Sequence, residues 1–146
     1  MEHGALSSPH LKEACFLVGK AFGVRNLGHF LYEITQVESK SGQRKSKFGG
    51  VCSISHYQFG LMQQHHRFYH HRKVILNSLG IDLKSINFAH LSNNPHLSLI
   101  IVAAWLLANI ERVPKRRLDR ARLFSKWWRA MPCSEYMEKT CDFQLV

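Results

Sequence analysis

The sequence predicts an α-rich α+β fold: a single domain spanning residues 1–146, with a small irregular or β segment between helices. Apolar residues recur with a helical period on both sides of a central stretch rich in glycine and serine. The chain has 146 residues, of which 45% are hydrophobic and 11% aromatic. This composition can fill one hydrophobic core and argues against a disordered chain, and the length suits one domain better than two.

Two helices are expected in the N-terminal part. Ser8 and Pro9 are typical of a helix start, apolar residues between positions 9 and 22 share one face, and Gly23 ends the helix. Asn26 is a suitable cap for a second helix that runs to about Ser39. Its apolar positions follow a helical period: Leu27, Phe30, Leu31, Ile34 and Val37.

The middle of the chain has no continuous helical pattern. Residues 40–58 contain three glycines and four serines, which predicts a loop with a short hairpin, and residues 51–57 could form a strand. Residues 60–79 are expected to include a helix that ends before Gly80.

The C-terminal part is expected to be helical again. Asn94 and Pro95 start a long apolar helix that runs to about Val113. Pro114 separates it from a basic helix over about 115–131, and the polar tail 133–146 is expected to be loosely held.

The charge is strongly positive, with 20 Lys and Arg against 10 Asp and Glu, and no acidic residue lies between Glu38 and Asp82. This balance favours an anionic partner, and nucleic acid, anionic lipid and an anionic cell-wall polymer all fit. No apolar run has the length of a membrane span, and no secretory signal is visible at the N-terminus. Four cysteines without a C-x-x-C spacing predict free thiols in a reducing compartment: Cys15, Cys52, Cys133 and Cys141.

Glu38 stands out on the second predicted helix. At 100° per residue from Leu27, Glu38 falls at about 20°, in the middle of the apolar face, whereas Glu33 falls at about 240° and is expected to face solvent. Burial and the negative end of the helix dipole would both favour the protonated carboxyl that a general acid needs. The alternative is a solvated Glu38, or one paired with Lys40 or Arg44.

Three segments resemble those of goose-type lysozymes and soluble lytic transglycosylases. Residues 38–42 (ESKSG) resemble the E-S-x-x-G segment of these enzymes, and residues 59–63 (FGLMQ) resemble their G-L-M-Q segment. Residues 94–106 are similar in spacing to D-P-x-x-N-I-x-x-G-x-x-Y-L, although Ser98 and Val102 depart from it. The resemblance covers about residues 25–130 and implies a lysozyme-like fold.

The resemblance implies cleavage of peptidoglycan at the β-1,4 bond between N-acetylmuramic acid and N-acetylglucosamine, without a cofactor or a metal. Glu38 would be the catalytic general acid. The implied substrate-binding residues are Ser39, Tyr57, Gln58, Gly60, Leu61, Met62, Gln63 and Trp127. Leu61 and Met62 would alternatively be ordinary core residues. The family's A-Y-N-A-G segment is missing, and Trp127 or Trp128 would replace the tyrosine that contacts the glutamate.

The distribution of acids bears on the reaction. Inverting hydrolysis needs a second carboxylate near the first, and none is present from residue 39 to residue 81. The sequence therefore favours a lytic transglycosylase, in which a substrate hydroxyl closes a 1,6-anhydro ring. Muramidase-type hydrolysis stays open if Glu33, Asp82 or Glu111 reaches the site.

Two basic segments allow other interpretations. On a helix, His66 and His70 could share a metal ion, but a solvated basic face that meets anionic wall polymer is favoured. The basic segment 115–129 with its adjacent tryptophans could bind single-stranded nucleic acid. The alternatives to an enzyme are therefore a non-enzymatic wall-binding or virion protein and a nucleic-acid-binding module. The expected location is the bacterial cell wall, reached from the cytoplasm after release or delivery, as in phage lysis.

Overall fold

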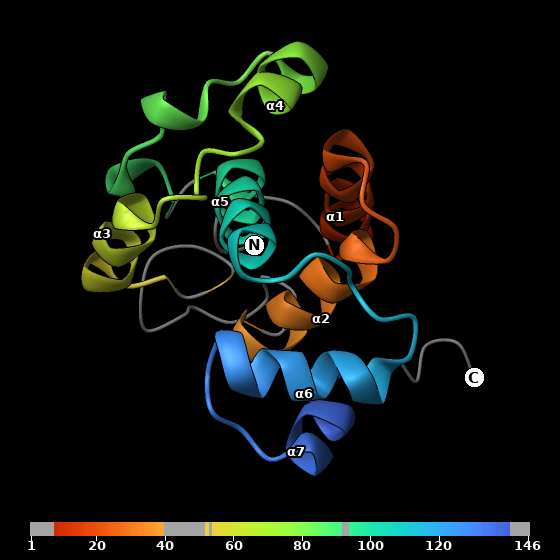
Figure 1. Ribbon diagram of the computed structural model, residues 1–146. Coiled ribbons are helices and arrows are strands. Elements are labelled where there is room, and N and C mark those ends of the chain that lie inside the picture. Colours follow the sequence, from red (N-terminus) through yellow and green to blue (C-terminus); the bar gives the residue numbers. More distant parts are fainter. Residues whose placement is uncertain (1–7, 40–51, 53, 92–93, 141–146) are drawn as a thin grey trace.

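The computed structural model describes residues 8–39, 52, 54–91 and 94–140, and 71% of these residues are helical. Figure 1 shows how the helices are arranged around α5. In chain order the elements are α1 (Ser8–Phe22), α2 (Leu27–Ser39), α3 (His56–Gln64), α4 (Arg72–Leu79), the short 3-10 helices η1 (Leu83–Ser85) and η2 (Phe88–His90), α5 (Pro95–Asn109), α6 (Arg117–Trp127) and α7 (Cys133–Lys139).

The predicted α+β class is wrong, because the described part of the chain contains helices and no strand or sheet. The expected strand over 51–57 is interrupted by the start of α3. Ser55 is the N-cap residue, and its hydroxyl accepts a hydrogen bond of 3.0 Å from the backbone N–H of Gln58. The rest of the expected loop and hairpin, residues 40–50, lies outside the described residues.

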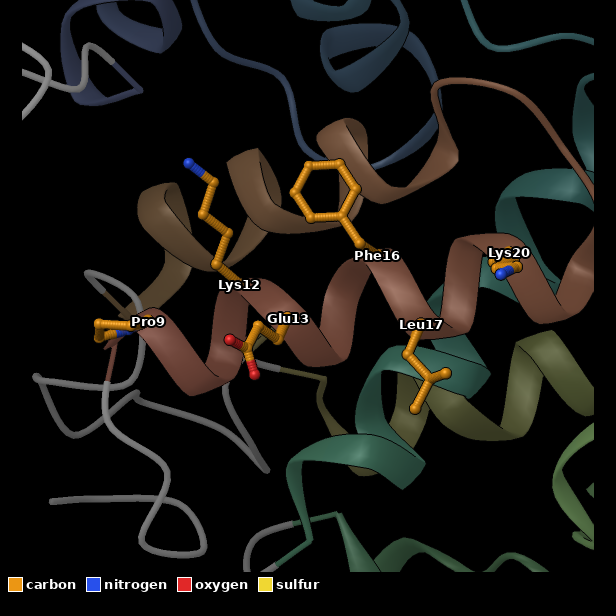
Figure 2. A pocket seen from close by; sticks show the side chains of 6 residues that line it. All are labelled: Pro9, Lys12, Glu13, Phe16, Leu17 and Lys20. Carbon is orange, nitrogen blue, oxygen red and sulfur yellow. The ribbon is translucent and has the colours of Figure 1, made fainter.

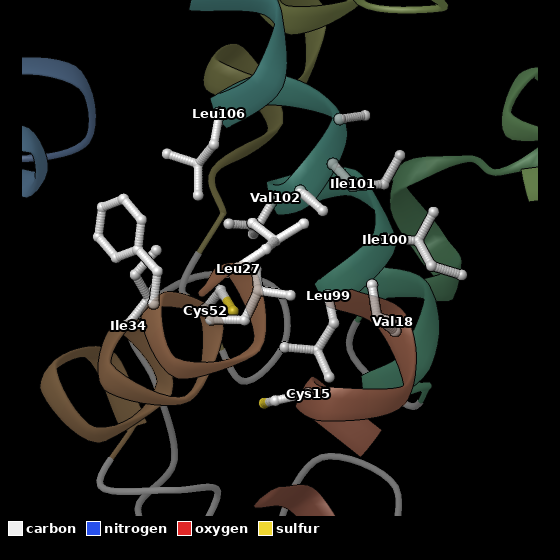
Figure 3. Packing of buried hydrophobic residues seen from close by; sticks show 14 of the residues in the cluster. Cys15, Val18, Leu27, Ile34, Cys52, Leu99, Ile100, Ile101, Val102 and Leu106 are labelled. Carbon is white, nitrogen blue, oxygen red and sulfur yellow. The ribbon is translucent and has the colours of Figure 1, made fainter. Parts of the chain in front are cut away.

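Helix α5 lies at the centre of the core, as its apolar sequence predicts (Figure 3). The Asn94 side chain caps it by accepting from the Leu97 N–H, and Pro95 opens its first turn. The buried hydroxyl of Ser98 donates to the Leu91 carbonyl at 2.8 Å, so this polar group has a partner within the core. The core around it includes buried residues from all seven α-helices.

Helices α1 and α2 pack closely, and two glycines allow the contact. A Cβ on Gly19 would lie 2.6 Å from the backbone nitrogen of Gly28. The turn between the helices uses left-handed backbone at Gly23 and at Asn26, where φ is 69°. The Asn26 amide donates to the Val113 carbonyl at 3.2 Å, so its side chain anchors the turn to the segment after α5.

The helix expected to end before Gly80 is confirmed as α4, and a separate helix, α3, precedes it across turns over 65–71. Predictions nearer the C-terminus need correction. The basic helix is shorter than predicted, since α6 ends at Trp127. The tail is not loosely held over residues 133–140: it forms α7, and the Tyr136 side chain is completely buried against the core.

No helix in the described ranges combines the length and apolar character that a membrane crossing requires. Cys15 and Cys52 are buried free thiols, and Cys133 is a half-buried one. Cys141 lies outside the described residues.

Candidate active site

Glu38 lies in the last turn of α2, and only 6% of its side chain is exposed. Its carboxylate is held by Arg129, just after α6. Arg129 Nε donates to Oε1 at 3.0 Å and Nη2 donates to Oε2 at 2.5 Å, which is a two-point ion pair. The guanidinium side of this pair faces outward, since 40% of the Arg129 side chain is exposed. The ends of α2 and α6 therefore meet at this carboxylate (Figure 1).

The surroundings of Glu38 act on its pKa in opposite directions. Burial raises the pKa of Glu38 and is the largest effect. Arg129 lowers it through its hydrogen bonds and its charge, and Lys139 of α7 lowers it through its charge. The net direction is upward, so the carboxyl accepts a proton more readily than an ordinary glutamate although it touches an arginine.

Trp128 completes the inner wall beside Glu38. Its indole N–H is buried and has no hydrogen-bond partner within the described residues, yet it is near enough to help lower the pKa of Glu38. The charge of Glu38 also contributes to the raised pKa of the buried Cys52 thiol. Glu38 thus has a buried neutral donor, the Trp128 indole, on one side and a partly exposed arginine, Arg129, on the other.

Glu33, the other buried glutamate of α2, is bound differently from Glu38. The prediction that it faces solvent is wrong, since its side chain is 8% exposed. Arg120 binds both carboxylate oxygens, at 2.7 and 2.6 Å, and the Tyr136 hydroxyl donates to Oε1 at 2.7 Å. Arg120 also donates to two backbone carbonyls, those of Pro114 and Lys115.

The two glutamates differ in access rather than in burial. Arg120 is itself only 7% exposed, so its pair with Glu33 is sealed within the protein and ties α2 to α6 and α7. The arginine that binds Glu38, Arg129, is by contrast 40% exposed. Of the two glutamates, Glu38 is therefore the one whose arginine partner is exposed at the surface.

A series of aromatic contacts connects α3 to this site. The rings of His65, directly after α3, and Trp105 of α5 meet edge to face with their centroids 5.6 Å apart. The Trp105 indole donates 3.2 Å to the carbonyl of Trp127, which precedes Trp128 and Arg129. The end of the G-L-M-Q helix is therefore joined through two tryptophans to the segment that holds Glu38.

The structure places the remaining predicted site residues on α3 or beside it. Tyr57 is 75% exposed and Leu61 is 46% exposed, Gln63 is also exposed, and Met62 is fully buried in the core. Gln58 and Gly60 are half-buried, and a Cβ on Gly60 would meet nothing within 4 Å. None of the hydrogen bonds and ion pairs found in the described ranges joins α3 directly to Glu38.

Trp127 and Ser39 are the other two predicted substrate-binding residues. The Trp127 ring is half-buried, and Lys126 Nζ lies 5.2 Å from its centre. Trp128, rather than Trp127, is the tryptophan whose indole approaches Glu38. Ser39 is the last residue of α2, and its side chain is outside the described part of the structure.

Two surface cavities lie away from Glu38, along α1. One, of about 610 Å³, is bordered by Lys12, Phe16, Leu17 and Lys20, whose side chains line the outer face of α1 in Figure 2. A neighbouring cavity of about 460 Å³ is bordered by His10, Glu13 and His96 among others. Neither contains a residue of the predicted site.

The histidines do not form a metal centre within the described residues, where no group of three or more His, Cys, Asp or Glu side chains converges. His66 and His70 lie in the turns between α3 and α4, so the helical spacing that would have paired them is absent. Their rings instead contact neighbouring histidines: His66 stacks on His65, and His70 meets His71 edge to face.

Sequence reasoning missed Arg129 and did not choose between the two tryptophans. The available signal was position, because Arg129 directly follows Trp127 and Trp128 and these align with the segment expected to approach the glutamate. No protein-family model, curated protein or solved structure is significantly similar to this chain. Any function proposed for this chain therefore rests on the arrangement of the chain's own side chains.

Proposed function

We propose that the protein is a peptidoglycan-cleaving glycosidase in which Glu38 is the general acid. The observation that carries the proposal is the asymmetry between the two buried glutamates of α2. Glu33 is bound by a buried arginine, whereas the arginine that binds Glu38, Arg129, is 40% exposed. Burial raises the pKa of Glu38, which favours the protonated form required to donate to a bridging oxygen. The resemblance of residues 38–42 and 59–63 to the glutamate and G-L-M-Q segments of lytic transglycosylases supports this substrate class.

The charges around Glu38 favour a reaction that uses one carboxylate. The groups that act on its pKa are Arg129, Lys139 and Trp128, and none of them is an acid. Glu33 is engaged by three hydrogen bonds and is enclosed. Retaining and inverting hydrolysis both require a second carboxylate beside the acid. None is found among the described neighbours of Glu38.

The reaction we propose is a transglycosylation within one sugar. Glu38 donates its proton to the oxygen that links N-acetylmuramic acid to N-acetylglucosamine, and the bond from that oxygen to the anomeric carbon breaks. The resulting carboxylate then accepts the proton of the muramic acid 6-hydroxyl, whose oxygen bonds to the anomeric carbon. The products are a 1,6-anhydro end and a free hydroxyl, and Glu38 regains its proton.

A second candidate is a protein that binds the cell wall without cleaving it. The ion pair with Arg129 favours this candidate, because an arginine that stays in place keeps the carboxyl ionised and covered. The net charge of +10 suits binding to an anionic polymer in either case.

Lysis of purified sacculi by three proteins separates these candidates: the wild type, Glu38→Gln and Glu33→Gln. Both substitutions remove one buried carboxylate from α2 and leave one arginine without its anion. We expect Glu38→Gln to lose lysis completely, whereas Glu33→Gln, assayed below its unfolding transition, keeps wild-type activity per folded molecule. Lysis by Glu38→Gln at the wild-type rate would eliminate Glu38 as the acid. Binding of sacculi by the wild type without any lysis would support the wall-binding candidate.

A further inference from the structure

We propose that Arg129 is a specificity-determining residue: it covers Glu38 in the free protein and is drawn away by a carboxylate of the glycan substrate. This inference rests on the proposed function and adds to it the class of substrate, a glycan strand that carries anionic groups.

The guanidinium is shared between the buried carboxylate and the surface. Its hydrogen bonds to Glu38 use Nε and Nη2, and Nη1 makes no hydrogen bond within the described residues. With 40% of the side chain exposed, the unused N–H groups are accessible from outside. Guanidinium groups prefer two-point contacts with planar anions, so a substrate carboxylate can compete for Arg129 with the same geometry that Glu38 uses.

When Arg129 moves outward, the Glu38 carboxyl still has a hydrogen-bond donor beside it. The buried Trp128 N–H, which lacks a partner, is beside the carboxyl and can donate to it. Exchanging a cation for a neutral donor removes the strongest stabilisation of the ionised form, while burial still disfavours it. Glu38 then takes a proton from solvent and becomes the acid that the proposed reaction requires.

The other groups that face Glu38 leave this exchange intact. Lys139 from α7 acts on the carboxyl only through its charge, and 42% of its side chain is exposed in a pair with Glu135. Cys52 has a pKa raised well above its ordinary value and is therefore neutral. Arg129 is thus the one charged group found to hydrogen-bond to the Glu38 carboxylate among the described residues.

A neutral polysaccharide would meet an energetic barrier that an anionic one avoids. Moving Arg129 without giving it another anion breaks a two-point, charge-assisted contact with no compensation. A strand that carries peptide carboxylates replaces the contact as it breaks. The arginine therefore admits anionic glycans and discriminates against neutral polymers of N-acetylglucosamine.

The test compares cleavage of peptidoglycan sacculi and of a neutral N-acetylglucosamine polymer by the wild type, Arg129→Gln and Arg129→Lys. We expect the wild type to prefer sacculi and Arg129→Gln to reduce the ratio of the two rates at least tenfold. Arg129→Lys should fall between them, because lysine keeps the charge and loses the two-point contact. Arg122→Gln is the matched control and should keep the wild-type ratio, since Arg122 is an exposed α6 arginine that pairs with the exposed Asp119.

A carboxyl NMR titration of Glu38 gives a second readout that does not depend on cleavage. Replacement of Arg129 by glutamine should raise the pKa of Glu38, and a soluble muramyl peptide should raise it in the wild type but not in Arg129→Gln. A rate ratio that is unchanged in Arg129→Gln, in a variant that still cleaves sacculi, would overturn this inference and leave the proposed function standing. If the wild type cleaves neither polymer, the proposed function fails and the inference fails with it.

Discussion

Replacing Arg120 with methionine leaves the Glu33 carboxylate buried without its cation. The structure sets the size of the effect, because Arg120 supplies two of the three hydrogen bonds found on Glu33 and also serves two backbone carbonyls. Only the Tyr136 hydroxyl would remain on the carboxylate. Breaking a buried pair by removing one partner costs about 3–5 kcal/mol, a large part of the roughly 5–15 kcal/mol that stabilises a typical domain.

The partner substitution Glu33→Gln shows whether the isolated charge causes this loss. Glutamine removes the negative charge and keeps an oxygen that can accept from Tyr136. The double variant Arg120→Met, Glu33→Gln should therefore be more stable than Arg120→Met alone by about 1–3 kcal/mol, although it carries one substitution more. Such recovery distinguishes an uncompensated charge from a simple packing defect.

Urea unfolding followed by circular dichroism measures both quantities, with the slope of the transition checked for constancy across the four proteins. The reasoning is refuted if Arg120→Met loses less than about 1 kcal/mol, which is below the range for an uncompensated buried charge. It is also refuted if the double variant is less stable than Arg120→Met by the full cost of Glu33→Gln, because the two sites would then be independent.

Two further predictions concern glycine packing and pH. Gly19→Ala should destabilise the protein by about 1–3 kcal/mol, because its Cβ would lie 2.6 Å from Gly28. Gly60→Ala, which meets open space within α3, should stabilise it by about 0.5–1 kcal/mol, and equal effects in thermal unfolding would contradict the packing argument. The ion pair with Arg72 lowers the pKa of Asp82 from its ordinary 3.8 to about 2, so its contribution is complete above pH 3.8 and disappears as the pH falls through about 2. The stability difference between the wild type and Asp82→Asn should shrink over that interval in acid-unfolding measurements, and a constant difference would show that the charge has no role.

The sequence predicted those helices whose signals are local. Periodicity was sufficient for α1 and α2, and the start of α5 was confirmed at Asn94 and Pro95. Asn26 does not cap α2 as predicted, because its backbone is left-handed and its side-chain amide donates to Val113. The strand over 51–57 failed because Ser55 caps a helix, and a short stretch with alternating apolar residues does not reveal which of the two structures its neighbours favour.

The candidate site was predictable only where it depended on one helix. The wheel placed Glu38 on the apolar face of α2, and its side chain is indeed buried. The same helical wheel predicted that Glu33 faces solvent, because the sequence of one helix does not show which other elements pack against its opposite face. That cover comes from Arg120 and Tyr136, which are 87 and 103 residues away in sequence. Arg129, 91 residues from Glu38, was missed for the same reason.

Mass spectrometry of the soluble fragments released from purified sacculi tests the central claim most directly. If Glu38 acts alone as acid and then base, the wild type should release fragments that end in 1,6-anhydro-muramic acid, and Glu38→Gln should release none. Fragments with ordinary reducing ends would contradict the single-carboxylate reaction, and the absence of any fragment from the folded wild type would contradict glycan cleavage itself.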